Sequence, residues 1–367
     1  MATATFSLCR RCAGGEGSRA RGVAWAAAAC APPPAARGPS TGTHRAPLGA
    51  PHAQAGALRL TTEFGRLLVS PGEIAVVPRG IRFSVGLELE PGGAAGARGY
   101  VLEVFGAHFA LPELGPLGSN GLAAARDFLA PAAAFADAAE AHTAVSKLGG
   151  ALFASPQAHS PFDVVAWHGN YYPYKYDLAK FCAAGSVSFD HPDPSIFTVL
   201  SAATDTPGVA LADFVIFPPR WMVAERTFRP PWFHRNVMTE FMGMVWGKYD
   251  AKVGFVPGGA SLHAACTPHG PDAPTFARAS AAPLAPDFFG AGLAFMFETC
   301  RILRVAPAAL AAPSRDAGYA DCWAALPRAF DPSSRAPATP LADGPPTGAT
   351  GAAAGTVYGD GTAAAVA

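Results

Sequence analysis

The chain has 367 residues, with 27 basic and 27 acidic side chains and a formal net charge of zero. This balance gives no electrostatic basis for binding nucleic acid or an anionic membrane, so we expect neither as a partner. No apolar run approaches the roughly 20 residues that a membrane span needs. The seven cysteines are odd in number and irregularly spaced, which argues against a disulfide framework and favours a reducing compartment such as the cytoplasm.

The first segment, residues 1–57, is rich in Ala, Arg, Gly, Pro and Ser, and Glu16 is its only acidic residue. An Arg-rich, acid-poor N-terminus is typical of organellar transit peptides, which makes an organelle the alternative compartment. A low-complexity tail is the other interpretation. In both cases we expect this segment to be disordered, because it has little β-branched or aromatic content with which to offset its ordering entropy.

The chain changes character at Leu58, where short β-type runs alternate with Gly and Pro. Leu67–Val69, Ile74–Val77 and Ile81–Leu89 are predicted strands, and Pro71–Gly72 and Pro78–Gly80 are the turns between them. Several short strands at such close spacing predict a β-sandwich or a β-barrel.

Residues 120–185 have a mixed pattern, with a short helix predicted around Ala132–Ala141. A second β-rich block runs from Val187 to Val305 and includes the apolar runs Phe214–Phe217 and Phe295–Phe297. The tail after Ser334 is mostly Ala, Gly, Pro and Thr, so we expect it to be disordered.

The densest cluster of reactive side chains lies in the second block. It contains His191, His234, His263 and His269, and Glu240 follows His234 by six residues. Two histidines and one carboxylate form the metal site of many iron(II) oxygenases, and neighbouring strands of a barrel can bring such ligands to one point. Spacing alone leaves the second histidine ambiguous. The Gly-rich turn before His263 resembles the second sequence box of cupin barrels and favours that residue over His269.

Three other interpretations fit the same residues. A zinc hydrolase would use the same histidine and glutamate ligands. A non-catalytic β-sandwich binding module would need none of them. Asp190 and His191 could form a hydrolase dyad, but no GxSxG nucleophile turn accompanies them.

Several long strings decide between these interpretations, because together they resemble the homogentisate 1,2-dioxygenase family from about Leu58 to about Phe330. The strings are GYVLEVFGAHFALPELGPLGSNGLAAARDFLAP, PFDVVAWHGNYYPYKYDLAKF, SFDHPDPSIFTVL, PPRWMVAERTFRPPWFHRNVMTEFMG and GGASLHAACTPHGPDAPTF. The resemblance implies iron(II)-dependent cleavage of the aromatic ring of homogentisate by O₂, which gives maleylacetoacetate in tyrosine and phenylalanine breakdown.

The resemblance also implies a role for each motif residue. In HRNxxxEFMG and TPHGPD it implies three iron(II) ligands, His234, Glu240 and His269. In FDH it implies His191 as the general acid/base, and in GKYDAK it implies Tyr249 as a substrate contact, together with His269. This assignment leaves His263 as a residue next to the ligands rather than a ligand.

The fold implied by the family is mainly β, an N-terminal β-rich domain followed by a cupin-like jelly-roll barrel. We expect the N-terminal domain at residues 58–185, the iron-binding domain at 186–333 and a disordered tail at 334–367. The family's motif near YxSGFGNE has no match in residues 1–57, so the first domain is expected to be incomplete. The family forms a homohexamer, and the alternative function is that of a truncated, inactive cupin-type metalloprotein.

Overall fold

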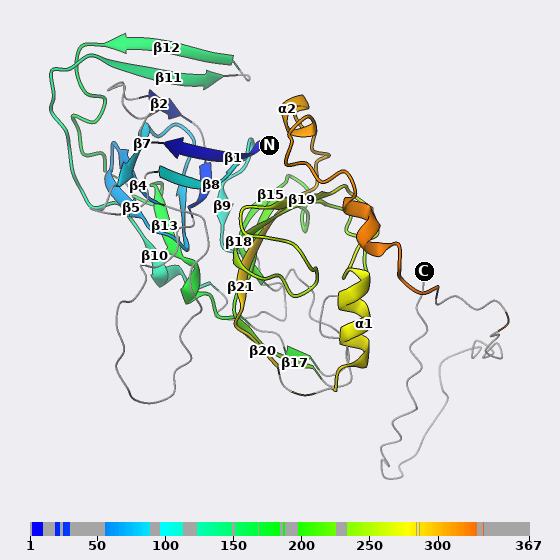
Figure 1. Ribbon diagram of the computed structural model, residues 1–367. Coiled ribbons are helices and arrows are strands. Elements are labelled where there is room, and N and C mark those ends of the chain that lie inside the picture. Colours follow the sequence, from blue (N-terminus) through cyan, green and yellow to red (C-terminus); the bar gives the residue numbers. More distant parts are fainter. Residues whose placement is uncertain are drawn as a thin grey trace, which may run out of the picture. The chain divides into compact units, whose positions relative to one another are not determined.

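The computed structural model describes three strands near the N-terminus and most of the chain from residue 56 to residue 328 (Figure 1). The described residues are 2–9, 19–22, 25–29, 56–88, 96–112, 123–148, 151–167, 169–183, 186–187, 197–224, 233–283, 285, 287–328 and 333. Contacts divide the chain into two compact units, Met1–Leu326 and Pro327–Ala367, and every element below belongs to the first. The tail predicted at 334–367 lies outside the described residues.

The first half of the chain is built from short strands and two single-turn 3₁₀ helices. The 3₁₀ helices are η1 (Ala125–Asp127) and η2 (Leu178–Lys180). The strands are β1 (Ala2–Cys9), β2 (Arg19–Gly22), β3 (Trp25–Ala29), β4 (Ala57–Thr62), β5 (Gly65–Val69), β6 (Glu73–Val77), β7 (Phe83–Glu88), β8 (Gly96–Glu103), β9 (Phe109–Ala110), β10 (Phe128–Leu129), β11 (His142–Leu148), β12 (Ala151–Gln157) and β13 (Tyr174–Asp177).

The second half is again mostly strands, so the prediction of a mainly β fold is confirmed. The strands are β14 (Ser186–Val187), β15 (Thr198–Ala203), β16 (Ala210–Phe217), β17 (Arg220–Ala224), β18 (Thr239–Gly247), β19 (Ala260–His263), β20 (Asp287–Phe289) and β21 (Gly292–Thr299). The helices are α1 (Ala273–Ala281), α2 (Pro307–Leu310) and the 3₁₀ helix η4 (Tyr319–Trp323). Among the described residues, no helix has the length and apolar character needed to cross a membrane.

The strands predicted from the first apolar runs are present. β4 pairs with β5 and β7 in a three-stranded antiparallel sheet, and β6 belongs to a six-stranded sheet with β8 and β13. On β5 the buried residues alternate with exposed ones, because successive side chains of a strand point to opposite faces. Gly72 and Gly80 occupy the two predicted turns with positive φ angles of 80° and 90°, a conformation that glycine adopts without strain.

Of residues 1–57 the structure describes only 2–9, 19–22, 25–29 and 56–57, so the expectation that this segment is disordered stays a prediction. The described residues include three strands that pair with later ones. β1 pairs with β8, β3 lies between β6 and β8, and β2 runs parallel to β11. Strand pairing uses backbone N–H and C=O groups, and open strand edges present such groups whatever the side chains of the added strand. A segment poor in large apolar residues can therefore still add strands to a sheet that its neighbours have formed.

The helix predicted around Ala132–Ala141 is wrong, since that stretch is extended. Ala132 exchanges two backbone hydrogen bonds with Arg66, at 2.8 and 2.9 Å, and Ala136 N–H donates to the Phe162 carbonyl oxygen at 2.7 Å. Alanine favours helices by less than about 1 kcal/mol per residue over most alternatives, so pairing with distant backbone outweighs that preference.

A six-stranded antiparallel sheet, in the order β19-β18-β21-β16-β15-β9, lies where the cupin-like barrel is predicted. All eight residues of β21 are buried, including Phe295 and Phe297, so both faces of this central strand are covered. The large apolar core includes residues from both halves of the chain, and β9 of the first half completes the sheet by pairing with β15. The domain boundary between residues 185 and 186 therefore stays a prediction.

Gly243 of β18 is fixed by its neighbours, and replacing it tests this core. A Cβ atom at Gly243 would lie 2.3 Å from the Phe295 ring and 3.1 Å from the Tyr100 ring, both of which are fully buried. We expect Gly243→Ala to lower the free energy of unfolding by about 1–3 kcal/mol, the usual cost of overpacking a core. Denaturant titration measures this. Gly86→Ala on β7 is the matched control, because its Cβ would meet nothing closer than 3.9 Å, and equal losses would contradict the packing.

Candidate metal centre

Glu240 is the second residue of β18, and the sheet register places it between two strands. It lies opposite His263 of β19 on one side and opposite Glu298 of β21 on the other. Its side chain is only 3% exposed. A buried carboxylate needs hydrogen bonds or a positive charge to offset its lost hydration, so its neighbours decide what it can do.

His234 and His269 are held together by the backbone. Each donates its N–H to the other's carbonyl oxygen at 2.9 Å, which forms an isolated antiparallel bridge between two loops. Cys266 N–H adds a third bond, at 2.7 Å, to the Asn236 carbonyl oxygen. The two imidazole rings consequently lie with their centroids 4.5 Å apart.

These two histidines and Glu240 form a three-residue donor cluster. One donor atom of each residue lies within 4.8 Å of the other two, and His269 Nε2 lies 2.8 Å from Glu240 Oε2. His269 Nδ1 lies 2.9 Å from the Thr267 carbonyl oxygen, which can only accept a hydrogen bond. His269 Nδ1 therefore donates to that carbonyl oxygen, and Nε2 donates to the Glu240 carboxylate. Nε2 is the nitrogen that would lose its proton and face a metal ion.

The Glu240 carboxylate is oriented by further hydrogen bonds. Asn236 Nδ2 donates to Glu240 Oε1 and to Glu298 Oε1, both at 3.1 Å, while Asn236 Oδ1 accepts from Met238 N–H at 3.0 Å. Because the amide is fixed at both ends, it holds one oxygen of the carboxylate in place and leaves the other to the histidines.

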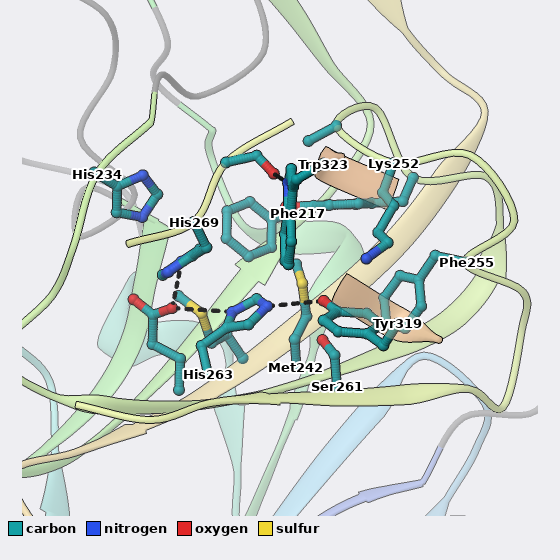
Figure 2. A pocket seen from close by; sticks show the side chains of 15 residues that line it. Phe217, His234, Met242, Lys252, Phe255, Ser261, His263, His269, Tyr319 and Trp323 are labelled. Atoms are coloured by element: carbon teal, nitrogen blue, oxygen red, sulfur yellow. Dashed lines mark hydrogen bonds and ion pairs between the residues drawn. The ribbon is translucent and has the colours of Figure 1, made fainter. Parts of the chain in front are cut away.

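His263 lies beside the donor cluster. Its Nδ1 is 3.3 Å from Glu240 Oε2, its Nε2 is 2.8 Å from the Tyr319 hydroxyl, and its ring stacks on His269 with centroids 4.0 Å apart (Figure 2). A neutral imidazole that donates from Nδ1 to the carboxylate and accepts at Nε2 from the phenol satisfies both contacts. The Gly-rich turn before His263 favoured that residue as the ligand, whereas the resemblance implied His269. The cluster contains His269, and His263 contacts Glu240 from beside it.

The electrostatics of the cluster keep the carboxylate charged. Burial by itself would raise the pKa of Glu240, but hydrogen bonds from His263 and His269 outweigh it and hold that pKa well below its ordinary value. Burial would lower the pKa of His269, yet the adjacent Glu240 carboxylate raises it above its ordinary value. Burial lowers the pKa of His263, with the Glu240 carboxylate opposing the shift.

A pocket opens beside the cluster. Its lining is largely apolar or aromatic, with a small number of polar groups, which is typical of a site for a small molecule. The lining residues are Phe217, His234, Glu240, Met242, Tyr249, Ala251, Lys252, Phe255, Ser261, His263, His269, Gly270, Met296, Tyr319 and Trp323 (Figure 2).

The loop after β18 supplies Tyr249 and Lys252 to this pocket and is anchored on both sides. Asp250 forms a buried 2.8 Å ion pair with Arg220. Asp272 Oδ2 accepts from Val253 N–H at 2.6 Å, and Asp272 also caps α1 by accepting from Thr275 N–H. Since Asp272 follows His269 by three residues, one carboxylate ties the loop to the strand-like segment that carries His269.

Tyr249 stays protonated in this environment. Burial, reinforced by the Asp250 carboxylate, raises the pKa of Tyr249 well above its usual value. Its ring packs edge-on against Phe217 and Phe255, with centroids 6.1 and 5.8 Å away. The hydroxyl is therefore a hydrogen-bond donor on a firmly held ring.

His191, which the resemblance implies as the general acid/base, lies outside the described residues. Its role therefore stays a prediction.

Sequence reasoning missed four residues of the site, namely Asn236, Lys252, Tyr319 and Trp323. Asn236 and Lys252 lie inside the HRN and GKYDAK strings, so close reading of those strings could have found them. Tyr319 and Trp323 lie about 50 residues beyond His269 in η4, and no local pattern indicates that this segment returns to the pocket.

Comparison with solved structures gives only weak likenesses. Protein Ylba from E. coli matches at 8% identity over 83% of this chain and 78% of that chain, with a TM-score of 0.30. A protein of unknown function from Pseudomonas syringae pv. tomato matches at 10% identity over 81% of each chain, with a TM-score of 0.29. Scores this low carry no argument about fold or function.

Comparison by sequence finds two relatives that bear the same name. A protein from Oryza sativa subsp. japonica named homogentisate 1,2-dioxygenase is 58% identical over 281 residues, 76% of this chain and 59% of that protein. Its namesake from Arabidopsis thaliana is 59% identical over 283 residues, 76% of this chain and 60% of that protein. The chain therefore spans 59–60% of the length of the curated relatives that it matches.

Family models agree with these relatives. The model described as homogentisate 1,2-dioxygenase N-terminal matches residues 52–178, and the one described as C-terminal matches residues 179–330, so the two follow each other without a gap. All three residues of the donor cluster lie in the second match. On these matches, the chain belongs to the homogentisate 1,2-dioxygenase family.

Proposed function

We propose that this chain is an iron(II)-dependent homogentisate 1,2-dioxygenase, which opens the ring of homogentisate with O₂ to give maleylacetoacetate. The single observation that carries the proposal is the cluster of His234, Glu240 and His269 beside an aromatic-lined pocket. Family membership supplies the substrate, since both curated relatives bear the name of this activity.

The donor set fits a divalent iron ion. Two neutral imidazoles and one carboxylate are the ligands of many non-haem iron(II) oxygenases, and they leave other coordination positions open. Ligand bonds of roughly 2.0–2.2 Å to one ion require donor atoms within about 4.4 Å of one another, and these lie within 4.8 Å before any adjustment. When bound, iron(II) would supply the Lewis-acid and redox chemistry that O₂ needs to react with an aromatic ring.

The remaining groups of the chain would bind, orient and deprotonate the substrate. The Tyr249 hydroxyl, held protonated, donates a hydrogen bond to a substrate oxygen. Phe217, Met242 and Met296 give the pocket apolar walls that exclude water from the ring. His191 accepts the phenolic proton, a task that suits an imidazole with a pKa near neutrality.

His263 has a supporting role in this proposal. Through its bonds to Glu240 and Tyr319 it holds the carboxylate toward the imidazoles and links it to the far wall of the pocket. Partners of metal ligands commonly set the orientation and basicity of those ligands.

The proposed activity is tested directly with the iron(II)-loaded protein. Adding homogentisate in air should consume one O₂ per substrate molecule and yield a ring-opened product that carries both oxygen atoms of labelled O₂. An oxygen electrode and mass spectrometry measure this, with chelator-treated and zinc-loaded protein as controls. Protein that holds one iron per chain but consumes no O₂ would favour the alternative, an inactive metalloprotein of the same family.

The metal ligands are tested by iron content after loading and desalting. His234→Ala, Glu240→Ala and His269→Ala should each abolish stable iron binding, because each removes one of three donors. His263→Gln should weaken iron binding by only about 10- to 100-fold, the usual effect of a residue next to the ligands. His159→Ala is the control, since His159 lies elsewhere and contacts Asp163. An iron loss in His263→Gln as complete as in His269→Ala would mean that His263 is a ligand.

The role of His191 is tested by separating iron content from turnover. His191→Ala should retain iron and lose about 10²–10⁴-fold in turnover, the range that a general acid/base contributes. His234→Ala is the comparison, as it should lose both. If His191→Ala also fails to hold iron, then His191 is a ligand and the assigned role is wrong.

A further inference from the structure

Lys252 has an unusual position in the pocket. Its Nζ atom is buried and has no hydrogen-bond partner among the residues that the structure describes. What it does contact is aromatic: Nζ lies 3.3 Å from the centroid of the Tyr319 ring and 4.7 Å from that of the Trp323 ring. Figure 2 shows the ammonium group pointing into the pocket between these rings and Phe255.

Within the described part of the chain, the Lys252 ammonium group therefore lacks a hydrogen-bond acceptor and a negative charge to balance it. A lysine ammonium has three N–H donors and a full charge, both of which are costly to remove from water without partners. The two aromatic faces attract the charge less strongly than a carboxylate partner would, and they satisfy none of the three donors. The pocket is therefore complementary to a negatively charged group placed at Nζ.

The carboxylates of the chain around Lys252 are already engaged. Asp250 is paired with Arg220 at 2.8 Å. Asp272 accepts two backbone N–H bonds, and Glu240 is held by the imidazoles and the Asn236 amide. None of these groups bonds to the Lys252 ammonium, so no carboxylate among the described residues neutralises it.

Lys252 and the donor cluster line the same pocket. A short series of contacts joins them: Lys252 lies on the Tyr319 ring, the Tyr319 hydroxyl bonds to His263, and His263 bonds to Glu240. One phenol and one imidazole thus separate the ammonium from the metal ligands, and Tyr249 lines the same space.

We propose that Lys252 binds the carboxylate of the substrate and so makes the site selective for aromatic acids over their uncharged analogues. This inference rests on the proposed function, in that the substrate is homogentisate with its phenolic end toward the donor cluster. The acetate side chain then reaches Lys252, while Tyr319 and Trp323 hold the ammonium in place. Lys252 is a binding residue for the ring's substituent and takes no part in the oxygen chemistry.

The test compares an acid with its neutral analogue under conditions where no turnover occurs. Iron(II)-loaded protein is titrated without O₂ with homogentisate and with its methyl ester, and Kd is measured by calorimetry. Wild-type protein should bind the acid more tightly. Lys252→Met should weaken binding of the acid by about 10- to 100-fold, the effect of losing a charge-assisted hydrogen bond, and should change binding of the ester by less than about threefold.

Two further variants keep the test decisive. Lys248→Met is the matched control, since Lys248 is exposed, lies four residues earlier in the same strand-to-loop segment and does not line the pocket. It should leave both Kd values unchanged. Lys252→Arg preserves the charge and should retain most of the preference for the acid, which also shows whether the position tolerates substitution.

Failure of this inference is distinguishable from failure of the proposed function. Equal binding of acid and ester by wild-type protein would overturn the role of Lys252, as would parallel losses for both ligands in Lys252→Met, even if O₂ uptake is normal. Conversely, a clear preference for the acid that depends on Lys252 in protein that never consumes O₂ would support the binding site and sink the dioxygenase activity.

Discussion

The two backbone hydrogen bonds between His234 and His269 are the constraint on which the candidate metal centre depends. Neither histidine belongs to a regular strand, and each lies on a loop. The two mutual bonds join the loops in a short antiparallel bridge and place the two imidazoles side by side next to Glu240. Because this order is established on folding, the conformational entropy is already lost before any ion or substrate binds, which favours binding.

The buried carboxylates near this bridge each have a positively charged or hydrogen-bonding partner. Asp250 has Arg220, whose guanidinium also lies over the faces of Phe197 and Phe289, and Glu240 has its imidazoles. In a low-dielectric interior, a buried charge without a partner costs free energy. A single unpaired charge in a pocket therefore indicates the charge that a ligand needs in order to bind there. Lys252 is the exception among the charged residues that line the pocket.

The elements that the sequence predicts well are those whose signal is local. Runs such as Ile74–Val77 became strands because alternating or continuous apolar residues and Gly turns act within a few residues. The helix predicted around Ala132–Ala141 was wrong because it rested on local alanine content. The backbone of Ala132 instead pairs with that of Arg66, which is 66 positions away in the sequence. The strands before residue 30 were missed for the same reason, since their partners are the backbone edges of β6 and β8.

The residues of the candidate site also fall into those that local sequence predicts and those that only the tertiary fold brings in. His234, Glu240 and His269 could be found from their strings, but spacing could not rank His269 above His263, because the choice depends on which loop reaches His234. Tyr319 and Trp323 could not be found at all, since they reach the pocket only through the tertiary fold.

The late position of η4 has a consequence for the order in which the chain is made. A ribosome would release the complete donor set, residues 234–269, some 50 residues before Tyr319 and Trp323 emerge. A chain ended by a premature stop between α2 and η4 would thus keep all three residues of the donor cluster. It would lose the aromatic faces over Lys252 and the phenol bonded to His263. Such a product would keep the donor cluster yet lack one wall of the pocket, so the presence of the three donors would not show that the pocket is intact.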